Sequence, residues 1–343
     1  MTVGLAIAAG LLILPLCAYR IAPDWPHELR DRALLTAGWL AGGLALWSEP
    51  GLGILYLCAV RRWRDAPSAS GPLMLGLACL IYGAVKWTSA DPQHAIRAAI
   101  VAGAIGQTLW AAFDLVYFGV YRFKLRSFHA IRELARGSMG NRVIVAAYLA
   151  IAAPLAPPWA LSLLIGGLAI TTSYVGMTAA IIGLAIAHPR WAPALFIAAL
   201  IAAPGLYWLR GHPRDSWNER THVWRLSLAM LYAGSWSQRL FGFGHGSFAW
   251  FGRYWTARKW TGQCFRQAHN DLVHLAVEYG LVGVAAVLLW GLNVSRGTFL
   301  GDPWTGALVA ALVVMMGQFP SYLPQTSMAV LCIVAVLARR VVG

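Results

Sequence analysis

Residues 266–290 read RQAHNDLVHLAVEYGLVGVAAVLLW, a stretch that joins a polar beginning to a strongly apolar end. His269 and Asn270 stand in the polar part, and the apolar part is densest over Leu281–Trp290. A helix of this composition would cross a membrane and hold its first turns at the surface, where side chains meet both water and lipid. The stretch therefore predicts a membrane helix with a polar start that is suited to chemistry.

The rest of the chain has the composition of a membrane protein. Of its 343 residues, 59% are hydrophobic and 12% are charged, whereas soluble domains average about 25% charged residues. We therefore expect an all-α polytopic membrane protein of about 10–12 transmembrane helices, each needing roughly 20 residues to span the bilayer. It would form one membrane domain over residues 1–343, with 2–19 retained as the first span. The apolar segments are 3–19, 33–60, 71–87, 95–119, 143–156, 158–172, 174–187, 191–209, 270–292, 304–318 and 325–338.

Most of the net charge of +14 lies in two predicted loops. The long loop, 210–268, carries nine basic residues against Asp215 and Glu219, and the shorter basic loop, 120–142, carries six against Glu133. Such focused charge predicts an anionic partner, namely lipid headgroups or a phosphorylated substrate. We expect no nucleic-acid partner, because no soluble domain is present to carry one.

The orientation follows from the C-terminal end. Three apolar segments follow the long loop, and the last is closed by Arg339 and Arg340. Because cytoplasmic ends are enriched in basic residues, this end is expected inside and the loop 210–268 outside. The same alternation places the basic loop 120–142 outside, against the positive-inside rule, which we attribute to a function of that loop.

Cofactor chemistry has little support in the sequence. Cys264 is the only cysteine of the long loop, and no CxxC motif occurs, which argues against redox and zinc sites. Asp24, Glu28 and Asp31 lie in a short loop and are spaced so that they could hold a divalent metal, although a balanced solvated loop is the simpler interpretation. We expect neither a cofactor nor a metal.

The long loop contains two patterned segments before His269. Residues 217–240 predict one amphipathic helix, with Trp224, Leu228 and Leu231 at helical spacing and Arg220 one turn before Trp224. A glycine-aromatic turn, GFGHGSF over 242–248, follows it. Glycines permit a tight turn with an accessible backbone that a ligand can approach closely. Its structural glycines are Gly242, Gly244 and Gly246.

Together these motifs resemble the O-antigen ligase/polymerase superfamily, bacterial membrane glycosyltransferases that use polyprenyl-pyrophosphate sugar donors. The resemblance rests on HN-x7-E-x-G-x2-G from His269 to Gly283, on the glycine-aromatic turn, and on the Arg-x3-Trp helix at Arg220. It covers about residues 80–335 and is most specific in the His-Asn block.

The resemblance implies an inverting transfer of a glycan from an undecaprenyl-type pyrophosphate to an acceptor hydroxyl, as in surface-polysaccharide ligation or polymerisation. It implies His269 as the catalytic base and Arg220 as a pyrophosphate ligand, with Arg266 and Asn270 as further substrate-binding residues. The acceptor would be a glycan or a lipid A core. The protein would lie in the bacterial inner membrane, among membrane lipids, with its active site facing the periplasm.

One family feature is missing. Where the family has an arginine at the junction of two short spans, this chain reads Thr172-Ser173-Tyr174-Val175-Gly176. Tyr174 therefore stands near the expected anion site, and Arg142 or Arg126 of the basic loop is expected to substitute for the arginine.

Three rival functions remain open at this stage. A metal-dependent glycosyltransferase would use the Asp24, Glu28 and Asp31 loop. A flippase for polyprenyl-linked glycans would need outward arginines but not His269. A non-catalytic membrane protein that binds lipid-linked glycans is the third rival.

Overall fold

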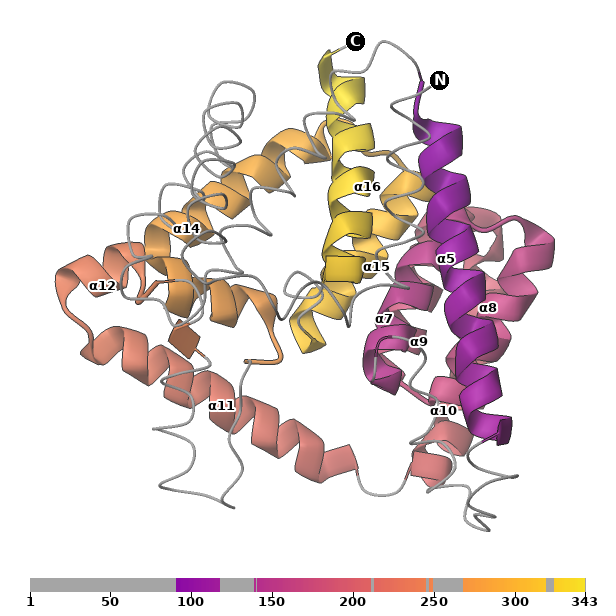
Figure 1. Cartoon of the computed structure of the whole chain (residues 1–343), viewed down its shortest axis with the longest axis horizontal. Coiled ribbons are helices and arrows are strands. Elements are labelled where there is room, and N and C mark those ends of the chain that lie inside the picture. Colours follow the sequence, from indigo (N-terminus) through magenta and orange to yellow (C-terminus); the bar gives the residue numbers. More distant parts are fainter. Residues whose placement is uncertain are drawn as a thin grey trace, which may run out of the picture.

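The computed structural model describes residues 91–117, 139, 141–210, 213–244, 247–248, 268–318 and 324–342. Within these residues the regular elements are helices and no strand occurs (Figure 1). The all-α prediction is confirmed for this part of the chain. The predictions for the first span, for the Asp24 loop and for most of the basic loop lie outside the described residues.

The helices from α7 to α10 follow one another with short connections. Two short 3-10 turns, η4 (Ala153–Leu155) and η5 (Pro189–Trp191), lie between them. The α-helices are α5 (Gln93–Asp114), α7 (Arg142–Ala152), α8 (Pro158–Thr171), α9 (Tyr174–Ala187), α10 (Ala192–Arg210), α11 (Pro213–Ala233), α12 (Trp236–Phe241), α14 (Asp271–Ser295), α15 (Pro303–Gly317) and α16 (Pro324–Val342).

Hydrophobic patterning located these helices well. Each predicted apolar segment from residue 95 onward corresponds to one helix, and 174–187 has the bounds of α9. The predicted junctions are also present, because Pro154 lies in η4 and Pro158 begins α8. Proline suits these places because it has no N–H to donate and its φ fits a first helical turn.

The predicted amphipathic helix over 217–240 is wrong as a single element. The chain forms α11 up to Ala233, turns at Gly234, and starts again as α12. Ser235 caps α12 through a capping box, since its hydroxyl accepts from Gln238 N and the Gln238 side chain accepts from Ser235 N. This reciprocal cap favours a new helix start over continuation.

Helices α5, α7, α8, α9, α15 and α16 share one buried core. Helices α9 and α15 run antiparallel and approach each other closely. A Cβ on Gly183 would lie 2.7 Å from the Gly306 carbonyl oxygen, and one on Gly306 would lie 2.4 Å from that of Gly183. Only glycine permits this contact, which brings two helix backbones together as small residues do in membrane proteins.

Two helices of the described part are long and apolar enough to cross a membrane: α5, extended to Tyr117, and α14. Both leave large apolar side chains exposed, including Leu109 and Phe113 on α5 and Leu288 and Leu292 on α14. Several other apolar helices have 10–17 residues, shorter than a full span. Two candidate spans are weak support for a membrane protein, and the predicted count of about 10–12 stays a prediction.

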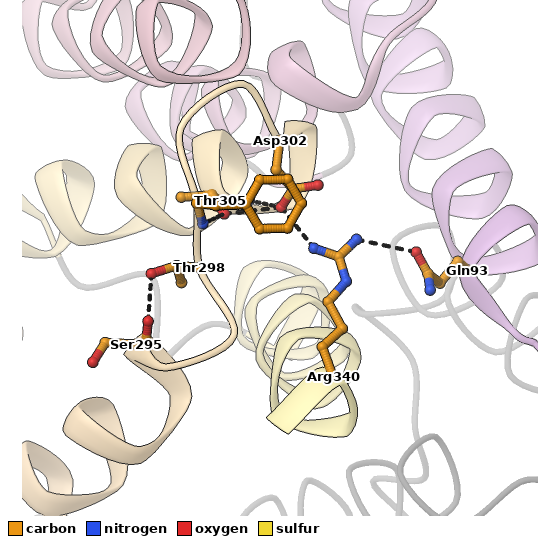
Figure 2. A network of polar contacts seen from close by, with 7 residues as sticks. Gln93, Ser295, Thr298, Asp302, Thr305 and Arg340 are labelled. Atoms are coloured by element: carbon orange, nitrogen blue, oxygen red, sulfur yellow. Dashed lines mark hydrogen bonds and ion pairs between the residues drawn. The ribbon is translucent and has the colours of Figure 1, made fainter. Parts of the chain in front are cut away.

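A polar network joins helices at one end of the bundle, which we call the Asp302 end (Gln93, Asp302, Thr305 and Arg340) (Figure 2). Asp302 Oδ2 caps α15, accepting from Thr305 N at 2.9 Å and from Thr305 Oγ1 at 2.8 Å. It also pairs with Arg340 Nη1 of α16 at 2.9 Å, while Arg340 Nη2 donates to Gln93 Oε1 of α5 at 3.3 Å. One carboxylate and one guanidinium thus join α5, α15 and α16.

We expect Asp302→Ala to destabilise the protein by about 1–3 kcal/mol, because it removes both the helix cap and the partner of Arg340. Asp302→Asn keeps an oxygen that can cap α15 and should therefore cost less. Thermal unfolding of the detergent-solubilised protein measures both. Equal melting temperatures for Asp302→Ala and the unchanged protein would show that the network contributes no stability.

Candidate functional site

His269 occupies the turn just before α14 and has a left-handed backbone, with φ 53°. This conformation is uncommon for a residue other than glycine and indicates that the surroundings impose it. The preceding residue is fixed from outside the turn, since Ala268 O accepts from Trp224 Nε1 of α11 at 2.7 Å. Helix α11 therefore helps to set the position of His269.

Asn270 caps α14. Its side-chain oxygen accepts from Leu272 N at 3.0 Å and from Val273 N at 3.1 Å, and its amide nitrogen donates to Met316 O at 3.2 Å. These bonds join the start of α14 to the end of α15, and Asn270 is almost fully buried. The structure thus gives Asn270 a positioning role, and its predicted contact with substrate stays a prediction.

The pKa of His269 is lowered to about 4. Burial is the largest cause, the positive charge of Arg220 and the nearby His274 act in the same direction, and a side-chain hydrogen bond with Gln318 opposes them. Burial and the two neighbouring groups, Arg220 and His274, each disfavour the imidazolium form of His269. His269 is consequently neutral at pH 7 and can accept a proton.

Arg220 approaches from α11. Its Nη1 donates to Gly317 O, the last residue of α15, at 2.8 Å. Gln318, which bonds His269, is the next residue of the chain. Arg220 of α11 and His269, in the turn before α14, therefore both bond to the end of α15, at Gly317 and Gln318. Burial lowers the pKa of Arg220, with Glu219 acting in the opposite direction, but a guanidinium remains charged at neutral pH.

The junction between α8 and α9 lies at the same end of the bundle. Thr172 ends α8 in a left-handed conformation, Ser173 caps α9, and Tyr174 is its first residue. Arg142 Nη1 donates to Thr171 O at 2.7 Å and lies 3.2 Å from Thr172 Oγ1. Arg142 thus reaches the junction that lacks an arginine of its own.

The end of α15 connects this junction to the His269 turn. Val175, next to Tyr174, lies beside Gly317, whose carbonyl oxygen accepts from Arg220. The N-termini of α7, α9 and α14 lie here, but so do the C-termini of α8 and α15, whose partial negative charge offsets that of the N-termini. With Arg142 and Arg220 added, this end of the bundle suits an anionic ligand.

The glycine-aromatic turn makes contact with α14 itself. Helix α14 is interrupted at Gly280, whose φ is 67°, so the carbonyls of the preceding turn need other donors. Phe243 N donates to Val277 O at 2.9 Å, and Gly244 N donates to Glu278 O at 3.0 Å. We expected the turn to admit a ligand, but the backbone it approaches most closely is that of α14.

Gly242→Ala should break this contact. Gly242 has φ 73°, and an added Cβ would lie 2.3 Å from the carbonyl carbon and oxygen of Glu278. The clash is with backbone, so α12 must move away from α14, and the cost should exceed the roughly 0.5–3 kcal/mol of an average substitution.

The matched control for that variant is Gly291→Ala, in α14, the helix that Gly242 contacts. A Cβ there meets nothing within 4 Å, and alanine favours a helix by about 0.8–1.0 kcal/mol over glycine. Thermal unfolding should show a large decrease for Gly242→Ala and no decrease for Gly291→Ala. Equal melting temperatures would contradict the backbone contact.

His274 and Glu278 form a buried pair between His269 and the interruption of α14. Their Nε2 and Oε1 atoms are 3.0 Å apart, one helical turn from each other, and the ring of Phe248 lies 4.8 Å from that of His274. The four-residue spacing was visible in the sequence.

Gln318 is the site residue that the sequence analysis did not predict, although it is a lone polar residue at the end of an apolar segment.

Three predicted site residues, Arg126, Arg266 and Gly246, lie outside the described residues. Within the described ranges no group of three His, Cys, Asp or Glu side chains is placed to hold a metal ion.

The sequence matches no protein-family model and no curated protein.

Proposed function

We propose that this protein is an inverting glycosyltransferase of the bacterial inner membrane. It moves a glycan from a polyprenyl pyrophosphate to an acceptor hydroxyl, from an active site that faces the periplasm. The observation that carries the proposal is that Arg220 and a neutral His269 meet at Gly317 and Gln318. A positive charge and a base at one point suit a reaction that releases an anion and a proton.

In the proposed reaction, the acceptor oxygen attacks the anomeric carbon, and the bond from that carbon to the pyrophosphate oxygen breaks. The hydroxyl proton passes to His269. The pyrophosphate leaves as an anion, so Arg220 and Arg142 can stabilise the developing charge without a general acid. Arginine suits this role because its planar guanidinium can bind phosphate through two hydrogen bonds.

Arg142 supports the proposal at the α8–α9 junction. The family that the sequence resembles has an arginine there, and this chain has Tyr174 instead. Arg142 donates to Thr171 O at 2.7 Å and so brings a positive charge to this junction, which supports the proposal. The proposed donor pyrophosphate would bind between Arg142 and Arg220.

The proposal is tested by incubating the purified protein with a polyprenyl-pyrophosphate oligosaccharide and candidate acceptors, a second repeat unit or a lipid A core. Mass spectrometry identifies the product and NMR the configuration of the new linkage. Transfer with inverted anomeric configuration is expected. Movement of intact donor across vesicle membranes without any transfer would instead indicate a flippase.

The pH dependence of kcat/KM should follow the protonation of His269. Its pKa of about 4 means that the base form persists well below pH 6, so kcat/KM should stay level from pH 8 to about pH 5. Activity should decrease only as the pH approaches 4, where His269 becomes protonated. Initial rates across this range measure it, and a decrease centred near pH 6.5 would contradict the buried environment of His269.

A further inference from the structure

Large side chains around the turn between α11 and α12 form what we call the anchor face. It consists of four exposed residues, Leu228, Tyr232, Trp236 and Leu240, and of half-buried Arg239. Tyr232 is 76% exposed and Trp236 is 75% exposed, while Leu228 and Leu240 are also exposed. The opposite side of α11 packs inward, through Val223, Met230 and Leu231. Contiguous apolar surface of this kind indicates a contact with something other than water.

Arg239 lies between the two aromatic rings of the anchor face. Its guanidinium carbon is 4.9 Å from the centre of the Tyr232 ring and 5.3 Å from that of Trp236, and its Nε donates to Gly234 O at 3.0 Å. The cation is thus held within an aromatic surface. Tyrosine, tryptophan and arginine together are typical of the headgroup level of a bilayer.

The anchor face adjoins the exposed apolar side of α14. Figure 1 shows α12 beside α14. Their backbones cross where a Cβ on Gly280 would lie 2.4 Å from Leu240 O, so the anchor face meets α14 at Gly280, the residue before Leu281. Leu281 is 56% exposed, and exposed Leu288 and Leu292 follow it along the helix. The surface therefore continues from the anchor face onto a helix long and apolar enough to cross a membrane.

We propose that the anchor face is seated in the headgroup layer of the bilayer that α14 enters beyond Gly280, with Arg239 binding a lipid phosphate. This continuity favours the membrane over a protein partner as the occupant. The proposal depends on α14 entering a membrane and not on glycosyl transfer. Because α11 also carries Arg220, the anchor would fix the height of the candidate site above the bilayer.

Spin-label depth measurements test the proposal in the full-length protein. The five native cysteines are replaced, and a nitroxide is attached at Tyr232→Cys or Trp236→Cys in vesicles of phosphatidylcholine and phosphatidylglycerol. Oxygen, which enters lipid, should collide with both labels more often than a water-soluble nickel chelate does. A control label at exposed Asn218→Cys, at the polar start of α11, should show the reverse.

Two results would overturn the proposal. Labels at 232 and 236 that collide with the nickel chelate as often as the label at 218 would place the face in water. Labels shielded from both reagents would mean that protein covers it. In the chain with its native cysteines, brominated lipids should quench less of the tryptophan fluorescence after Trp236→Phe. An unchanged quenched fraction would also count against it.

Arg239 is tested separately. Raising the phosphatidylglycerol fraction should lower nickel collisions at label 236, because more anionic headgroups are available to Arg239. Arg239→Gln should reduce this response. An equal response in the two proteins would overturn the assignment of Arg239 to a lipid phosphate.

Discussion

His269→Asn is expected to reduce glycosyl transfer by about 10²–10⁴-fold, the usual contribution of a general base. Asparagine tolerates the left-handed backbone that His269 adopts, with φ 53°, and keeps a polar side chain beside Gln318. The variant therefore removes the proton acceptor with little disturbance of the turn. Product formation from a polyprenyl-pyrophosphate oligosaccharide measures the loss.

Two further variants separate chemistry from conformation. His269→Ala removes the base and also strains the left-handed backbone, so an inactive alanine variant beside an active asparagine variant would indicate a structural role only. His188→Ala is the matched control, because His188 follows α9 at its far end and makes a tilted ring contact with Trp191. Its activity should be unchanged.

The apolar helices could be predicted because each of them is a largely apolar run of residues that is bounded by polar residues, glycine or proline in the sequence. The sequence predicted the bounds of α9 to the residue, and it predicted the start of α14 at Asn270, which caps that helix in the structure. Local chemistry also explains the α7–α8 junction, where prolines end one helix and begin the next. These features depend on residues close together in the chain.

Contacts between distant segments could not be predicted in the same way. Gly242 and Gly280 each look like flexible points, but only the structure shows that they are two sides of one backbone crossing. Gln318 follows an ordinary apolar helix, and its bond to His269 depends on how α14 and α15 pack. The break of the predicted 217–240 helix at Gly234 could have been predicted from the Ser235 capping box that follows it. The helical spacing of apolar residues favoured one continuous helix instead.

Arg220→Ala should reduce transfer by about 10²–10³-fold, the usual cost of removing one group that stabilises charge in a transition state. Arg220→Lys keeps the charge but loses the planar pair of donors, so its activity should lie between those of the alanine variant and the unchanged protein. Steady-state kinetics with varied donor measure this. Arg225→Ala, exposed on the same helix, is the matched control and should be fully active.

The pH profile of the Arg220 variants distinguishes an electrostatic role from a structural one. Arg220 lowers the pKa of His269 because its positive charge disfavours the imidazolium. Removing that charge in Arg220→Ala should raise the pKa of His269 and move the acid limb of kcat/KM to higher pH. Arg220→Lys retains the charge and should leave the limb nearer its original position. If both variants keep the original limb, Arg220 acts through its bond to Gly317 O alone, and its role in binding pyrophosphate would have to be abandoned.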